Sequence, residues 1–173
     1  AKGKVKFRYV PVLLGGIFKA TGNKPPLMTY GHVAQKVAYD RLEMQRFMAL
    51  HNITGFQFNP HFPVNTLLAM RGAIAAEQLG CGAAYREAMY TALWQDGQKL
   101  DEPDVWARVV DQAGLDSSAL AARTTDEAVK AELVSNTEGA VARGAFGVPT
   151  FFLGDEMWFG KDRLRDVVEA AGG

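Results

Sequence analysis

The C-terminal segment carries the pattern that most restricts the fold of this chain. Val148–Leu153 is an apolar, β-prone run that predicts a strand, and Glu156–Phe159 is expected to return beside it. The intervening Gly154-Asp155 pair is typical of the turn that closes a hairpin. Apolar residues then recur at helical spacing, which predicts a last helix from Asp162 to Gly172. The chain is therefore expected to end in a strand–strand–helix unit.

A long block of helices precedes this unit. Helical spacing of apolar residues, capping residues such as Asn65 and glycine stops predict helices over 33–51, 65–80, 85–98, 101–114, 117–122 and 125–143. Nearer the N-terminus, Val5–Pro11 alternates apolar and basic residues, which predicts a strand. Leu13–Phe18 leads into a polar stretch with Gly22, Pro25 and Pro26, which is expected to form a loop. This order of elements predicts an α/β domain with a helical insertion.

The composition is that of one soluble globular domain, with 173 residues of which 48% are hydrophobic and 22% charged. The single cysteine, Cys81, excludes an internal disulfide, a Cys-x-x-Cys pair and a multi-cysteine zinc site within these residues. Cys81 itself is expected to be a buried, inert thiol. One cysteine is typical of a reducing compartment, so we expect a cytoplasmic protein. No apolar run reaches the roughly 18 residues of a membrane span.

The zero net charge hides an uneven distribution. Residues 1–50 contain nine basic and two acidic side chains, whereas residues 101–173 contain seven basic and fourteen acidic ones. The basic N-terminal part favours an anionic ligand, although the two ends of the chain can equally neutralise each other in the fold. The basic residues are scattered and have no interleaved aromatic residues, so neither a nucleic acid nor a membrane is expected as a partner.

Other chemistry-bearing residues are less specific. The three histidines lack the spacing of a metal site, so no metal is expected; they are His32, His51 and His61. Three phenylalanines lie in a proline-broken loop, at Phe56, Phe58 and Phe62. They are expected either to line a pocket for an aromatic substrate or to pack on the helical block, and packing is the commoner outcome.

Three stretches resemble known glutathione-using proteins. Gly15–Pro26, with the sequence GGIFKATGNKPP, resembles the segment that follows the second strand of kappa-class glutathione transferases. Gly147–Thr150 and Phe152–Leu164 are similar to the C-terminal half of the 2-hydroxychromene-2-carboxylate isomerase family, and Phe62–Gly72 also fits. These isomerases belong to the DsbA-like branch of thioredoxin folds, so the resemblance spans nearly the whole chain in consistent order.

The resemblance implies an α/β, thioredoxin-like (DsbA-like) sheet with a large all-helical insertion. Residues 1–35 and 144–173 are expected to form the thioredoxin-like domain, and residues 36–143 the helical insertion domain. In the family, a first strand and helix precede the strand at which this chain opens, together with a catalytic serine that binds the glutathione sulfur. We therefore expect roughly 30 further residues upstream, the length of a strand and crossover helix, and assign no catalytic residue within 1–173.

The resemblance also implies a cis peptide bond at Val148–Pro149, because thioredoxin-like folds carry a cis-proline at this place. A cis bond here is expected to turn the backbone N–H and C=O of Val148 outward. A peptide-like ligand can then add to this edge through main-chain hydrogen bonds. The ligand that the family implies is glutathione, a tripeptide with two carboxylates and one ammonium group.

Four further glutathione-binding residues follow from the resemblance. Asn23 matches an asparagine that contacts the ligand, and Lys36 matches a basic residue that meets the glycyl carboxylate, with Lys24 as the alternative. Lys161 and Asp162 match the pair that holds the γ-glutamyl end, where a helix start favours a carboxylate and Asp162 suits the ammonium. Without the resemblance, Asp162 is an ordinary helix cap and each lysine a solvated charge.

The activity that the resemblance implies is glutathione-dependent cis–trans isomerisation of a 2-hydroxychromene-2-carboxylate-like aromatic catabolite. The bound thiolate would add to the conjugated system of the ring-opened substrate, permit rotation and then leave. The alternatives are a kappa-like transferase or peroxidase that consumes glutathione, and a DsbA-like thiol-disulfide oxidoreductase or glutathione-binding module. A small aromatic substrate is the expected partner, and the resemblance is compatible with a homodimer.

Overall fold

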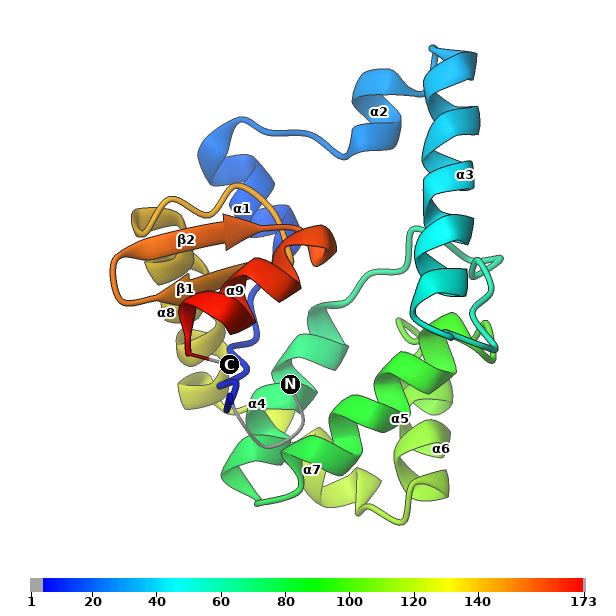
Figure 1. The fold of residues 1–173 in the computed structure, drawn as a ribbon. Helices are drawn as coiled ribbons and strands as arrows, with labels where there is room; N and C mark the ends of the chain where they lie inside the picture. Colours follow the sequence, from blue (N-terminus) through cyan, green and yellow to red (C-terminus); the bar gives the residue numbers. More distant parts are fainter. Residues whose placement is uncertain (1–4, 173) are drawn as a thin grey trace. The chain divides into compact units, whose positions relative to one another are not determined.

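The structure is a computed structural model that describes residues 5–172. In chain order the elements are α1 (Leu14–Thr21), α2 (Pro26–Tyr30), α3 (Ala34–Leu50), α4 (Leu67–Gln78), α5 (Gly82–Trp94), α6 (Pro103–Gln112), α7 (Ser117–Thr124), α8 (Glu127–Ala142), β1 (Thr150–Leu153), β2 (Glu156–Phe159), the 3₁₀ turn η1 (Lys161–Arg163) and α9 (Leu164–Ala170) (Figure 1). The predicted helical block and terminal strand–strand–helix unit are thus confirmed, with ends that differ by a few residues.

The chain divides into two compact units. The first, which we call the terminal unit, contains both ends of the chain, up to Asn23 and from Ala131 onward. The second, the helical unit, is Lys24–Lys130. The sequence predicted domain boundaries at 35/36 and 143/144. Compact units defined by contacts do not test domain boundaries, so these boundaries stay a prediction.

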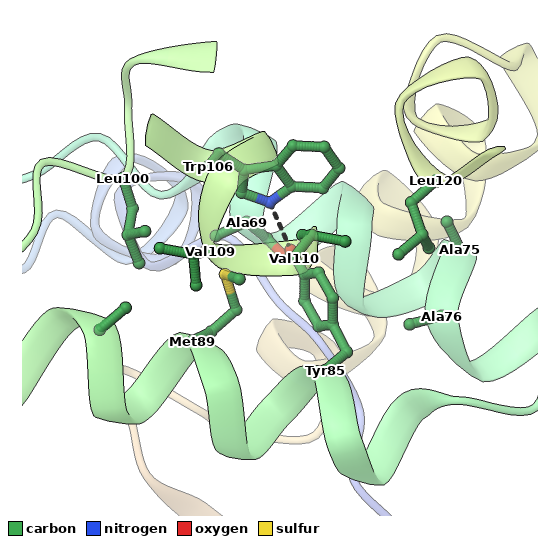
Figure 2. Packing of buried hydrophobic residues seen from close by; sticks show 11 residues of the cluster. Ala69, Ala75, Ala76, Tyr85, Met89, Leu100, Trp106, Val109, Val110 and Leu120 are labelled. Atoms are coloured by element: carbon green, nitrogen blue, oxygen red, sulfur yellow. Dashed lines mark hydrogen bonds between the residues drawn. The ribbon is translucent and has the colours of Figure 1, made fainter. Parts of the chain in front are cut away.

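The core of the helical unit lies among α4, α5, α6 and α7, whose buried side chains converge in Figure 2. The cluster consists of Ala69, Ala75, Ala76, Tyr85, Met89, Ala92, Leu100, Trp106, Val109, Val110 and Leu120. Alanines on α4 allow α5 and α7 to approach closely, and larger side chains from the neighbouring helices fill the space between them. These four helices therefore pack around one shared core.

Two polar atoms are satisfied inside this core. The Trp106 indole Nε1 donates to the Tyr85 hydroxyl at 2.8 Å, and that hydroxyl donates to the Ala69 carbonyl at 3.0 Å (Figure 2). Burial raises the pKa of Tyr85 far above its ordinary value of 10.0, and the hydrogen bond from Trp106 lowers it by less. Tyr85 is therefore a neutral, fully bonded core residue over the physiological pH range.

Helices α2 and α3 of the helical unit contain no buried residue. Met28 on α2 and Leu50 at the end of α3 are 75% and 76% exposed. Ion pairs one turn apart lie on the surface of α3, among them Lys36 with Asp40 at 2.8 Å. The helix predicted over 33–51 is confirmed, and surface ion pairs of this kind add about 0.2–0.5 kcal/mol each to its stability.

In the terminal unit, α1 packs on α8 at Thr137. The Leu13 N–H donates to the Thr137 hydroxyl at 3.0 Å, and this hydroxyl donates to the Leu133 carbonyl at 2.7 Å. A Cβ on Gly16 would lie 3.0 Å from Thr137 Cγ2, so glycine permits this close approach. Ile17, one residue further along α1, is fully buried.

The rest of the terminal unit is a two-stranded hairpin and the last helix. Strands β1 and β2 are antiparallel, with Thr150 opposite Phe159 and Leu153 opposite Glu156, so Gly154 and Asp155 form the predicted turn. Helix α9 packs against β1 and buries Val167. The hairpin turn lies at one end of this small sheet, and residues 148–149 and 160–162 lie at the other.

One expectation for the N-terminal part is wrong. Val5–Pro11 is not a strand, because among the described residues only β1 and β2 pair, with each other, and no neighbour supplies ladder hydrogen bonds to this segment. Phe7 nevertheless lies against Phe151 of β1, with ring centroids 6.2 Å apart. The predicted loop around Gly22 and Pro25 lies between α1 and α2, whereas the helix α1 that precedes it was not predicted.

Candidate functional site

The hairpin brings the predicted cis-proline beside the start of the 3₁₀ turn. The Val148–Pro149 peptide bond is cis, which confirms the prediction for this bond. The Gly160 N–H donates to the Pro149 carbonyl at 2.9 Å, one step beyond the last strand pair. Lys161 and Asp162 follow Gly160 directly, so the open end of the hairpin holds four of the predicted site residues.

The segment before Pro149 is held by side chains on both sides. The Asn23 amide Nδ2 donates to the Phe146 carbonyl at 2.8 Å, and the Thr150 hydroxyl donates to the Gly147 carbonyl at 2.7 Å. We call residues 146–149 the cis-proline segment. Three of its four carbonyls, those of Phe146, Gly147 and Pro149, therefore accept hydrogen bonds from the terminal unit itself.

Val148 is the one residue of the cis-proline segment whose carbonyl accepts no hydrogen bond from the described residues. Neither its N–H nor its C=O has a hydrogen-bond partner among the described residues, and the residue is 41% exposed. Backbone groups without a protein partner must be satisfied by solvent or by a ligand. The two unpaired groups of Val148, which we call the Val148 edge, are thus available for main-chain hydrogen bonds between carbonyls that are already bonded.

Phe159 covers the first half of the segment. Its ring lies 4.5 Å, centroid to centroid, from the ring of Phe146. A Cβ on Gly147 would lie 2.9 Å from Phe159 Cε2, so only glycine fits beneath this ring. The sequence analysis did not identify Phe146, Thr150 or Phe159 as site residues; the signal that was available is the Gly-Val-Pro-Thr run followed by an aromatic strand.

Asn23 reaches the cis-proline segment because α1 ends abruptly. Gly22 takes a left-handed conformation, with φ of 70°, and directs the chain away from the helix axis. The resemblance implied that Asn23 contacts the ligand, but in the structure its amide nitrogen is bonded to Phe146. Its predicted contact with a ligand stays a prediction.

Lys161 and Asp162 are both exposed at the open end of the hairpin. The Lys161 ammonium donates to the Asp162 carboxylate at 2.5 Å, which makes the two side chains an ion pair in the structure. Gly160, with φ of 94°, allows the sharp turn that leads into them. An incoming ammonium or carboxylate group finds both charge signs on adjacent residues here.

Lys36 belongs to the helical unit rather than to the terminal unit. It lies in the first turn of α3, where its ammonium pairs with Asp40 and is 5.3 Å from the centroid of the Tyr30 ring. Its predicted contact with a glycyl carboxylate, and the alternative, Lys24, stay predictions.

The aromatic loop of the helical unit is packed on one side and open on the other. Phe56 stacks on Trp94 with ring centroids 5.7 Å apart, which corresponds to the packing alternative. Phe58 and Phe62 remain 61% and 55% exposed. The Asn59 side chain anchors the loop by donating to the carbonyls of Leu93 and Gln98.

The described residues contain neither a candidate metal site nor a candidate membrane span. Within residues 5–172, no three His, Cys, Asp or Glu side chains are grouped to hold a metal ion. No helix in the described part of the chain has the length and apolar character needed to cross a membrane. Cys81 is partly buried, whereas full burial was expected.

A cis-proline ahead of a strand hairpin, a helix after the hairpin and a helical unit between the chain ends define a thioredoxin-like protein. The family model described as "DSBA-like thioredoxin domain" matches residues 1–172, and the chain belongs to this family. This confirms the fold class and the family that the sequence motifs predicted.

Several characterised relatives are similar over nearly the whole chain. A 2-hydroxychromene-2-carboxylate isomerase of Pseudomonas sp. (strain C18) is 34% identical, and the match covers 96% of this chain and 76% of the relative. The 2-hydroxychromene-2-carboxylate isomerase of Pseudomonas putida is 32% identical, and the match covers 95% of this chain and 79% of the relative. Glutathione S-transferase kappa 1 of Rattus norvegicus is 28% identical, over 92% and 75% respectively.

A solved structure is similar as well. The structure of a 2-hydroxychromene-2-carboxylate isomerase superposes with a TM-score of 0.80 at 31% identity. The superposition covers 95% of this chain and 79% of that chain.

Proposed function

We propose that this protein is a glutathione-dependent isomerase of a 2-hydroxychromene-2-carboxylate-like aromatic catabolite. The observation that carries the proposal is the similarity to two isomerases of this name, at 34% and 32% identity over 96% and 95% of the chain. The kappa-class relatives, whose names specify glutathione, support the choice of cofactor.

The residues at the open end of the hairpin fit glutathione. The unpaired N–H and C=O of Val148 suit the peptide backbone of a tripeptide. The Asp162 carboxylate suits its ammonium group and the Lys161 ammonium suits a carboxylate. When bound, glutathione supplies a thiolate nucleophile that is regained in each turnover.

This chain's own contribution is binding and orientation. Val148 would fix the tripeptide by its backbone, and Asp162 would orient the γ-glutamyl end by its charge. Holding two reactants in a fixed geometry is worth a large part of the barrier to a bimolecular addition. No residue of 1–173 is assigned to activation of the thiol.

A cofactor-dependence assay tests the proposal on the full-length polypeptide. We expect 2-hydroxychromene-2-carboxylate to be converted to its ring-opened isomer, trans-o-hydroxybenzylidenepyruvate, only when glutathione is present, with no net loss of free thiol. Conversion at the same rate without glutathione, or absence of calorimetric binding at millimolar glutathione, would contradict it.

Two variants test the assigned binding residues. Asp162→Asn is expected to raise the glutathione Kd about tenfold or more, since it removes a charge-assisted hydrogen bond. Asp155→Asn makes the same change in the hairpin turn, at the far end of the sheet, and is expected to leave the Kd unchanged. Equal effects of both variants would exclude the proposed role of Asp162.

A glutathione transferase is the second candidate, favoured by the kappa-class relatives at 28% and 26% identity. A transferase consumes glutathione in a one-to-one ratio with its substrate, whereas an isomerase does not. Titration of free thiol during turnover distinguishes the two.

A further inference from the structure

The Asn23 side chain links the end of α1 to the cis-proline segment. Its Nδ2 donates to the Phe146 carbonyl, 123 residues away in sequence, at 2.8 Å. The other carbonyl bonds of the segment are local, since Gly147 is bonded by Thr150 and Pro149 by its hairpin neighbour Gly160.

The orientation of the Val148 edge depends on both ends of the segment. Beyond Val148, the bond from Gly160 and the strand pairing hold Pro149. Before Val148, the Phe146–Gly147 peptide group is held at its carbonyl by Asn23, and the Phe159 ring lies over it. Release of this carbonyl would allow the peptide groups on the N-terminal side of Val148 to rotate.

We propose that Asn23 is a positioning residue for glutathione binding. Its hydrogen bond to the Phe146 carbonyl fixes the direction of the Val148 N–H and C=O, which would bind the tripeptide. This rests on the proposed function and deepens it, because it makes the geometry of the Val148 edge depend on α1. The role differs from a direct contact between Asn23 and the ligand, since it is present in the ligand-free protein.

NMR of the ligand-free, full-length polypeptide tests whether Asn23 holds the Phe146 carbonyl in place. Asn23→Asp places a carboxylate against the Phe146 carbonyl, and Asn23→Ala removes the donor without adding charge. Both variants are expected to shift the Gly147 amide nitrogen, which belongs to the same peptide group. They should also lower the backbone order parameter of the Val148 N–H, because one of the two anchors of the segment is lost. Asn52→Asp, the same substitution at an exposed turn of the helical unit, is expected to change neither signal.

Calorimetry with glutathione tests the positioning. We expect both Asn23 variants to raise the Kd about fivefold while the melting temperature stays close to that of the wild type, because the bond is exposed. Weaker binding without any change in the ligand-free signals would mean direct contact and would overturn the proposal. Changed ligand-free NMR signals together with an unchanged glutathione Kd would overturn the proposal too. Failure of the wild type to bind glutathione refutes the proposed function together with the positioning role, and it differs from both of these results.

Discussion

Tyr85 and Trp106 illustrate how single atoms restrict the residues around them in the helical core. The hydroxyl of Tyr85 lies so close to α4 that a Cβ on Gly72 would be 2.2 Å from it and 3.0 Å from Trp106 Cζ2. Glycine at position 72 is therefore required by close approach and not by backbone conformation. The same hydroxyl satisfies the Trp106 indole and the Ala69 carbonyl.

Gly72→Ala is expected to lower the free energy of unfolding by about 1–3 kcal/mol, because Tyr85 and Trp106 must shift to admit the methyl group. Gly139→Ala on α8 is the matched control. Nothing lies within 4 Å of a Cβ there, so it is expected to raise stability by about 0.5–1 kcal/mol. Urea denaturation measures both changes, and a neutral Gly72→Ala would contradict the contact.

The buried Tyr85 hydroxyl also predicts that the free energy of unfolding depends on pH at alkaline pH. Its pKa is raised by burial, so the folded state keeps the proton above pH 10, where the unfolded chain releases it. The unfolded state then binds fewer protons, and the free energy of unfolding falls as the pH rises beyond about 10. Tyr85→Phe is expected to be less stable at pH 7 by about 1–3 kcal/mol, since the Trp106 N–H loses its acceptor. Its urea midpoint should decline less between pH 9 and 11 than that of the wild type; equal declines would argue against the buried tyrosine as the source.

At the scale of elements, α1 is helical because of what it packs on. Two consecutive glycines, Gly15 and Gly16, disfavour a helix locally. Contact with Thr137 of α8 and burial of Ile17 provide the compensating interactions. The position of Asn23, one residue beyond the helix C-cap, depends on this packing.

Thr137→Val is therefore expected to loosen α1. The valine keeps the shape but leaves the Leu13 N–H without its acceptor, which costs about 1–2 kcal/mol. Hydrogen exchange of the Ile17 amide, which is bonded to the Leu13 carbonyl, should speed up by a corresponding factor. Thr124→Val, at a similarly buried threonine whose hydroxyl bonds only within α7, is expected to leave this amide unaffected. Protection that is equal in both variants would contradict the proposed contact.

At the scale of the whole molecule, the main hydrophobic cluster lies within one unit of the chain. All of its residues, from Ala69 to Leu120, belong to the helical unit. The loop that precedes α4 is anchored to the same unit by Asn59 and by the stacking of Phe56 on Trp94. The cluster thus needs no side chain from the terminal unit.

A fragment of residues 55–126 is expected to fold by itself, because it contains the whole cluster and its polar anchors. Circular dichroism should show a cooperative thermal transition, and Trp106 fluorescence should be that of a buried indole. The same fragment with Trp106→Ala is expected to lose about 3–5 kcal/mol and with it the transition. A fragment that is helical but melts without cooperativity would contradict a self-contained core.

Sequence patterns were sufficient to predict the helical block, the hairpin with its Gly154-Asp155 turn and, through family motifs, the cis bond at Val148–Pro149. These features depend on local periodicity, turn chemistry and capping, which adjacent residues encode. Residue similarity was equally sufficient for the family, which needs no coordinates.

The remaining features depend on contacts between residues far apart in the chain. The alternation in Val5–Pro11 predicted a strand, but a strand needs a paired neighbour, and pattern alone cannot supply one. Helix α1, which the sequence pattern did not predict, forms because α8 provides its packing surface. Asn23 was identified from a motif, yet its bond to Phe146 spans 123 residues and becomes visible only when both ends of the chain are folded together.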